Sequence, residues 1–263
     1  PLVDIRLMET TDIHANVMDY NYYGDAADPK VGLVRTATLI KQARAALDFP
    51  DNSFLVDNGD LIQGSPMGDW RHAEGLPAGE IHPVYKAMNE LGYDVANYGN
   101  HEFNYGLEFL AESVNDAGFP YISANVFVDD DDDNPDNDQL YFEPYRLVTK
   151  SVRDRDGNSH DITVGFIGFL PPQTMQWDKK NLEGEVITKD IKAMAERYVP
   201  RMKAEGADVI VAIPHSGIST TAYSEADKAE NSSWYLADVE GIDAIMFGHS
   251  HLLFRSDSFA DTP

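Results

Sequence analysis

The chain contains no cysteine, which excludes disulfides, thiolate metal sites and thiol catalysis. No run of about 18 apolar residues occurs, so we expect no membrane span.

Basic residues are few: 20 lysines and arginines stand against 45 acidic residues, and the formal net charge is −25. Such a charge argues against binding of a nucleic-acid polymer, because phosphate backbones are held by positive surfaces. A small phosphate substrate is compatible with it when bound metal ions reverse the local sign of the charge.

The 263 residues, of which 43% are hydrophobic, suffice for one large domain. Apolar runs of strand length alternate with stretches of helical spacing. Strands are predicted at 4–10, 53–56, 94–98, 121–128, 145–152, 162–170, 208–213 and 243–247, and helices at 33–47, 84–91, 107–117, 191–203 and 234–239. The turn Asp156-Gly157-Asn158 joins two β-rich runs and predicts a hairpin. This order of elements predicts an α/β layered domain with a mixed sheet.

Polar side chains follow directly after most of the predicted strands. They are Asp12 and His14 in TTDIHAN, Asp57, Asn58 and Asp60 in VDNGD, Asn100 and His101 in YGNHEF, His215 in IPHSG, and His249 and His251 in FGHSH. Five of the eight histidines lie at these positions, although a lone histidine is usually structural. Clustered imidazoles without partners are costly to bury. Because ligands bind at the carboxyl ends of the strands in α/β sheets, we expect these residues to line one cleft.

The residue types in this cleft indicate a class of metal. Imidazole and carboxylate ligands without sulfur favour Zn, Mn, Fe, Co or Ni over Ca alone. The ligands are too many for one tetrahedral ion and suit two ions, and Asp60 can bridge because a carboxylate has two oxygens. Two ions about 3.5–4 Å apart activate a water molecule and clamp a phosphate for in-line displacement.

Five motifs follow one another across residues 12–251: D-x-H in TTDIHAN, G-D in VDNGD, G-N-H-E in YGNHEF, H in PHSG and G-H-x-H in GHSH. Together they resemble the calcineurin-like metallophosphoesterases. TTDIHAN, the GNHEFNYG block and GHSH look like the bacterial 2′,3′-cyclic-nucleotide 2′-phosphodiesterase/3′-nucleotidases, which are relatives of the 5′-nucleotidases. The resemblance implies a layered metallophosphoesterase fold, with mixed β-sheets flanked by helices.

The resemblance also implies two divalent metal ions, which would be Mn, Zn, Fe or Co. One ion would be held by Asp12, His14, Asp60 and His251, and the other by Asp60, Asn100, His215 and His249. His101 would bind no metal. It would protonate the leaving oxygen of the substrate, or stabilise the charge of the transition state.

Two further side chains in the same turn have expected roles. Asn104 stands where the 5′-nucleotidase relatives carry an aspartate that orients the histidine. An amide can orient His101 through a hydrogen bond but offers no charge, and this asparagine is associated with the cyclic-phosphodiesterase branch. Glu102 either accepts hydrogen bonds from backbone N–H groups of the turn or supports a metal-bound histidine.

The implied reaction opens 2′,3′-cyclic nucleotides to 3′-nucleotides and then releases nucleoside and phosphate, as in nucleotide catabolism. A 5′-nucleotidase-like phosphomonoesterase is the alternative, against which Asn104 and the GHSH ending argue. A non-catalytic metal-binding module is a third reading, but it would have no use for His101. Stacking on the base of a nucleotide is a weaker expectation for the side chains of Met67, Trp70, Trp177 and Trp234.

Family members carry a longer catalytic domain and a C-terminal nucleotide-binding domain. We therefore expect residues 1–263 to form a catalytic domain without its last strands, and without that C-terminal domain. The chain begins at Pro1 rather than Met and contains no cysteine, so we expect a periplasmic or secreted protein whose signal segment has been removed.

Overall fold

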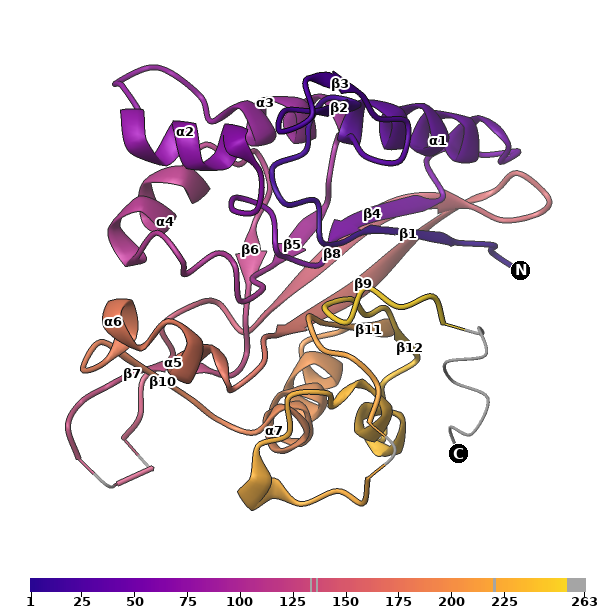
Figure 1. The fold of residues 1–263 in the computed structure, drawn as a ribbon. Coiled ribbons are helices and arrows are strands. Elements are labelled where there is room, and N and C mark those ends of the chain that lie inside the picture. The colour runs from indigo at the N-terminus through magenta and orange to yellow at the C-terminus, as the bar shows by residue number, and fades with distance from the viewer. Residues whose placement is uncertain (133, 136, 220, 255–263) are drawn as a thin grey trace.

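The computed structural model describes residues 1–132, 134–135, 137–219 and 221–254. Two four-stranded sheets dominate it (Figure 1). The first has the order β1-β4-β5-β6 and consists of β1 (Arg6–Thr10), β4 (Ser53–Asp57), β5 (Val95–Asn97) and β6 (Tyr121–Ile122), all paired in parallel. The second has the order β12-β11-β9-β8 and consists of β8 (Tyr145–Arg153), β9 (Ser159–Phe169), β11 (Val209–Pro214) and β12 (Ala244–Ile245).

A hydrophobic core joins the two sheets face to face. Its fully buried side chains are Phe54, Val56, Val95 and Ile122 from the first sheet, and Val164, Phe166, Val211 and Ile213 from the second. The rings of Phe54 and Phe166 lie 5.8 Å apart across the interface. Burying these side chains removes apolar surface from water and fixes the distance between the strand ends of the two sheets.

Helices cover the outer face of each sheet and complete four layers (Figure 1). The first sheet is covered by α1 (Leu33–Ala45), α2 (Pro66–Glu74), α3 (Pro83–Leu91) and α4 (Leu107–Val114). The second is covered by α7 (Ile191–Ala204) and the 3₁₀ helix η2 (Ser233–Asp238). The smaller elements are β2 (Tyr20–Asn21), β3 (Ala26–Ala27), β7 (Val126–Val128), α5 (Thr174–Trp177), α6 (Lys179–Leu182), β10 (Val186–Thr188) and η1 (Glu225–Asp227).

The expected layered α/β class is confirmed, and so is the hairpin of β8 and β9 around Gly157. The expected mixed sheet is the second one, whereas the first is entirely parallel. One strand prediction was wrong in detail, and one helix was missed. The strand predicted at 121–128 is split, because β6 pairs with β5 whereas β7 pairs with β10. Helix α2 was not predicted, since its sequence PMGDWRHAE has no clear apolar period.

Within the described ranges, no helix combines the length and the apolar character that crossing a membrane requires. The acidic run at 129–138 lies between β7 and β8, and two of its members, Asp133 and Asp136, lie outside the described residues. At its end, Asp138 forms an ion pair with Lys189.

Candidate functional site

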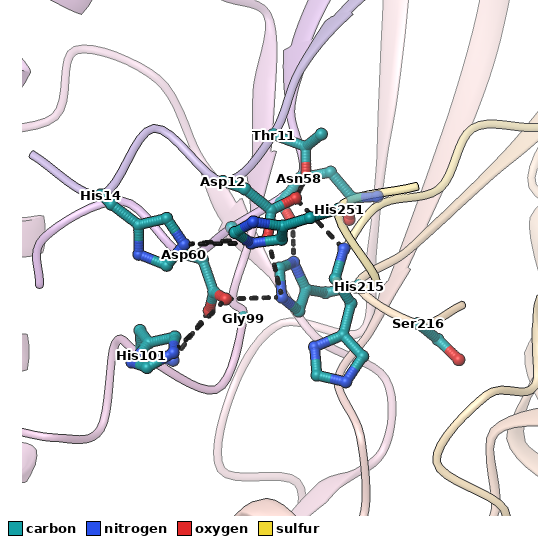
Figure 2. Close-up of polar contacts among 12 residues, drawn as sticks. Thr11, Asp12, His14, Asn58, Asp60, Gly99, His101, His215, Ser216 and His251 are labelled. Carbon is teal, nitrogen blue, oxygen red and sulfur yellow. Dashed lines mark hydrogen bonds and ion pairs between the residues drawn. The ribbon is translucent and has the colours of Figure 1, made fainter. Parts of the chain in front are cut away.

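The polar residues singled out in the sequence lie in loops that follow the strands of both sheets. Asp12 and His14 follow β1, Asp60 follows β4, Asn100 and His101 follow β5, His215 directly follows β11, and His249 and His251 follow β12. Figure 2 shows side chains from both sheets pointing toward one another. The expected convergence on one site is therefore present, and it occurs where the strand ends of the two sheets meet.

Two groups of three side chains lie close enough to share a metal ion. The first is Asp12, His14 and His251, in which Asp12 Oδ1 lies 3.0 Å from His251 Nε2. The second is Asp60, His215 and His249, in which Asp60 Oδ2 lies 2.9 Å from His215 Nε2. The family resemblance assigns the first three side chains to one ion and the second three to the other, and this assignment stays a prediction.

A third group overlaps the other two and consists of His14, Asp60 and His101. In it, His101 Nε2 lies 4.0 Å from Asp60 Oδ2. Asp60 and His14 each belong to two of the three groups, so the third group links the other two. Asp60 stands between His215 and His101 in Figure 2, and its role as a bridging carboxylate stays a prediction.

Backbone strain is concentrated in the same loops. In the described part of the chain nine non-glycine residues have positive φ, and five of them are predicted ligands with φ between 49° and 71°: Asp12, His14, Asp60, His249 and His251. Side chains with a Cβ seldom adopt this conformation, and it tends to persist at functional sites. Close loop contacts add to the constraint, since a Cβ at Gly99 would collide with Asp60.

Three buried ligand atoms lack a hydrogen-bond partner among the described residues: Asp12 Oδ1, Asn100 Oδ1 and His215 Nε2. Asp12 Oδ1 lies 3.0 Å from His251 Nε2, and His215 Nε2 lies 2.9 Å from Asp60 Oδ2. A buried polar atom without a partner is costly unless an ion or water binds it. The donor set is oxygen and imidazole nitrogen, which suits Mn, Zn, Fe or Co. These residues therefore fit a divalent metal centre.

The ionisable side chains at the centre shift the pKa values of one another. Burial disfavours the protonated form of His215, but the carboxylates of Asp60 and Asp12 outweigh burial and raise its pKa to about 9. Burial acts to raise the pKa of Asp60, yet His215 and His101 hold it well below its usual range. These carboxylates favour a proton on His215, and a divalent cation would take the place of that proton, since a metal ion binds the neutral imidazole.

Each of three histidines is held through one ring nitrogen, which leaves the other for the centre. His14 Nδ1 lies 2.9 Å from the Gln63 carbonyl oxygen, and His215 Nδ1 lies 2.5 Å from that of Asn58. His249 is held in the opposite sense, because its Nε2 lies 2.9 Å from Glu230 Oε1. Such partners fix ring orientation and tautomer.

Glu102 joins two loops of the site. It is fully buried, and its Oε2 accepts hydrogen bonds from the backbone N–H of Asp60 at 2.8 Å and of Gly99 at 2.6 Å. Its Oε1 accepts from Leu61 N at 2.5 Å and Ile62 N at 3.3 Å. The first of the two expected roles, hydrogen bonding to backbone N–H groups, is the one that the structure contains. Glu102 thereby fixes the loop of Asp60 against the turn of Asn100.

His101 lies at the edge of the centre with 36% of its side chain exposed. Its Nδ1 is 2.6 Å from Asn104 Oδ1, and its backbone N–H donates to Asp60 Oδ1 at 2.8 Å. The contact that an orienting role for Asn104 requires is therefore present, while the role itself stays a prediction.

Two residues of the site were missed from the sequence, and a third has another contact than the one considered. Glu230 contacts His249, Trp177 stacks on His249 with ring centroids 5.8 Å apart, and Asp178 accepts hydrogen bonds from Asn104. Trp177 was considered only for stacking on a base. Glu230 and Asp178 belong to no motif, so no sequence signal identified them.

Comparison with known proteins agrees with this geometry. The chain is 55% identical over 258 residues to a 2′,3′-cyclic-nucleotide 2′-phosphodiesterase/3′-nucleotidase of Yersinia enterocolitica, a match that covers 98% of this chain and 38% of that protein. It is 48% identical to the Haemophilus influenzae protein of the same name, over 99% of this chain and 38% of that protein. The chain thus spans less than two fifths of the length of these relatives.

Solved structures show the same fold. The calcineurin-like phosphoesterase YfkN from Bacillus subtilis superposes with a TM-score of 0.91 and 45% identity, covering 100% of this chain and 76% of that one. A putative 5′-nucleotidase from Staphylococcus aureus gives a TM-score of 0.74 at 25% identity, over 94% of this chain and 45% of that one. The profile of the calcineurin-like phosphoesterase family matches residues 5–253, a range that contains the five motifs and the whole candidate centre. The chain belongs to the calcineurin-like phosphoesterase family.

Proposed function

We propose that this chain is the catalytic domain of a two-metal phosphoesterase that hydrolyses 2′,3′-cyclic nucleotides to 3′-nucleotides, and these to nucleoside and phosphate. One observation carries the proposal: two groups of ligand-type side chains are linked by a third group of His14, Asp60 and His101, which brings His101 to the same centre. The relatives at 48–55% identity are named for this pair of activities.

Under this proposal, seven side chains hold two ions. Asp12, His14 and His251 would bind one ion, Asn100, His215 and His249 the other, and Asp60 both. When bound, the ions supply an activated water and neutralise charge on the phosphoryl oxygens. Mn, Zn, Fe and Co all match these ligand types.

The remaining chemistry belongs to the protein side chains. The P–O bond that breaks leaves charge on a ribose oxygen, and His101 Nε2, which lies 4.0 Å from Asp60 Oδ2, would protonate that oxygen. Nδ1 of the same ring is engaged by Asn104, so the ring keeps one orientation. The same proton transfer serves the opening of the cyclic diester and the later hydrolysis of the 3′-phosphate.

Two other functions are weaker. More distant relatives, at 27–30% identity, are named 5′-nucleotidases, and such an enzyme would use the same centre. A non-catalytic metal-binding module would need the ligands but not the ordered His101. A periplasmic or secreted location and a further C-terminal nucleotide-binding domain also stay predictions.

The test is a substrate panel with protein loaded with Mn²⁺ or Zn²⁺. We expect turnover of 2′,3′-cyclic and 3′-nucleotides, and of bis-p-nitrophenyl phosphate, with little turnover of 5′-nucleotides. His101→Ala should lower kcat for the cyclic nucleotide by about 10² or more, the range of general acid–base catalysis. His160→Ala is the matched control, because His160 pairs with Asp154 on the β8–β9 hairpin, outside the site.

Each contrary outcome identifies the failing step. Preference for a 5′-nucleotide would replace the cyclic-phosphodiesterase assignment by the 5′-nucleotidase one. Unchanged turnover in His101→Ala would remove His101 from the mechanism. Absence of turnover in the metal-loaded wild type would favour the metal-binding module.

A further inference from the structure

We infer that Asp178 is a positioning residue that holds His101 in its catalytic orientation through Asn104; this rests on the proposed function. Asn104 Nδ2 donates to both carboxylate oxygens of Asp178, at 3.0 and 2.9 Å. The other end of the same amide, Oδ1, lies 2.6 Å from His101 Nδ1. The Asn104 side chain itself carries no charge. In the structure, the Asp178 carboxylate lies on the side of the Asn104 amide that faces away from His101.

A capping role does not explain Asp178. It stands at the N-cap of α6, where an aspartate commonly accepts a hydrogen bond from the first turn of the helix. Its side chain makes no such bond and turns to Asn104 instead. Asp178 is only 3% exposed, and both oxygens of its carboxylate accept from the Asn104 amide. A buried carboxylate held by one amide costs free energy, so stability alone does not account for it.

Asp178 determines which way the Asn104 amide faces. The two ends of an amide are alike in shape, and hydrogen-bond partners decide their placement. A carboxylate only accepts, so the NH₂ group must face Asp178 and Oδ1 must face His101. If the amide were reversed, Asn104 Oδ1 would lie against the carboxylate oxygens of Asp178, with no hydrogen between them.

The orientation of the amide in turn selects the tautomer of His101. Since Asn104 Oδ1 only accepts, His101 Nδ1 must carry a hydrogen. Nε2, which lies 4.0 Å from Asp60 Oδ2, is then the nitrogen that exchanges a proton with the substrate. Without Asp178 the amide can turn over, and its NH₂ group would then favour the tautomer with the lone pair on Nδ1.

The segment that carries Asp178 is anchored to both sides of the site. Asn181 Nδ2 donates to the carbonyl oxygens of Phe103 at 2.9 Å and Asn104 at 3.1 Å, which holds the turn through its backbone. Trp177 stacks on His249 with an interplanar angle of 25°. Substitution of Asp178 therefore removes its contacts with the Asn104 amide while Asn181 keeps the turn in place.

The test combines Asp178→Ala and Asp178→Asn with His101→Ala, using the metal-loaded chain. We expect Asp178→Ala to lower kcat for a 2′,3′-cyclic nucleotide by about 10-fold to 100-fold, as loss of an outer hydrogen-bond partner often does, with little change in KM. Asp178→Asn retains one acceptor and should lose less. In the His101→Ala background, Asp178→Ala should change kcat by no more than about twofold, because the pair acts as a unit.

A second substrate separates positioning from structural damage. The loss should be smaller for bis-p-nitrophenyl phosphate, whose leaving group needs little proton donation, than for the cyclic nucleotide. Asp154→Ala is the control for removing a buried aspartate, since Asp154 is 2% exposed and caps the distant β8–β9 hairpin. Its kcat should equal that of the wild type for both substrates.

NMR with ¹⁵N-labelled histidine gives a readout independent of turnover. The His101 signal, assigned by its absence in His101→Ala, should show hydrogen on Nδ1 in the wild type, and a mixture of tautomers in Asp178→Ala. An unchanged tautomer and unchanged kcat in Asp178→Ala, or an equal loss in the His101→Ala background, would overturn the inference. Failure of the proposed function is distinct, since the wild type itself would then not hydrolyse the cyclic nucleotide.

Discussion

Glu102→Gln is the substitution whose cost follows most directly from the structure. The Glu102 carboxylate accepts four backbone hydrogen bonds, two on each oxygen. Glutamine keeps one of these oxygens and places an NH₂ group at the other, so two buried N–H donors face a donor. At about 1–3 kcal/mol for each unsatisfied buried group, unfolding should become easier by roughly 2–6 kcal/mol. This is a large part of the stability of a typical domain.

The assay is urea unfolding of wild type and variant, with metal content measured in parallel. Glu112→Gln is the matched control, because Glu112 is exposed on α4 and should change stability by no more than about 0.5 kcal/mol. Loss of stability in Glu102→Gln should accompany loss of activity, since the loops of Asp60 and Asn100 separate. An unchanged free energy of unfolding with weakened metal binding would refute this reasoning, and would support the other role considered for Glu102.

Three further predictions concern the core, the pH dependence and the metal. Phe166→Ala should cost about 3–5 kcal/mol in urea unfolding, because the ring is fully buried between the sheets against Phe54; a cost near zero would contradict the described interface. Burial and the charge of Arg71 lower the pKa of His82 to about 4, below the unfolded value of about 6.5. The unfolded state therefore binds more protons at His82 in that window, so the free energy of unfolding of the wild type relative to His82→Asn should fall by about 2 kcal/mol from about pH 7.5 to about pH 5. An unchanged difference between the two proteins would contradict this. Removal of metal by a chelator should lower Tm in a thermal scan, since the ions bind the folded state, whereas an unchanged Tm would count against the centre.

Much of the site was predictable because its residues lie next to strand ends. Asp12, Asn100 and His215 each stand within three residues of a strand, and parallel strands bring such positions to one edge. The regular periods of α1 and α7 and the Gly157 turn likewise predicted their elements correctly. Local sequence thus identifies the residues of the candidate metal centre, the hairpin and most of the layers.

The unpredicted parts depend on contacts between distant segments. The Asn104–Asp178 bond joins residues 74 positions apart, and the His249–Glu230 contact comes from a loop without any motif. The division of 121–128 between two sheets also depends on pairing partners that an apolar run does not specify. These contacts and pairings depend on how the two sheets and the α5–α6 segment pack together. Patterns within short stretches of the sequence therefore do not predict them.

The central claim is that this chain hydrolyses cyclic nucleotides with two ions held around Asp60. Its most direct test is titration of metal-free protein with Mn²⁺ or Zn²⁺ while hydrolysis of a 2′,3′-cyclic nucleotide is followed. The account predicts that kcat rises to a plateau at two equivalents of metal per chain. Full activity at one equivalent, or activity without metal, would contradict it.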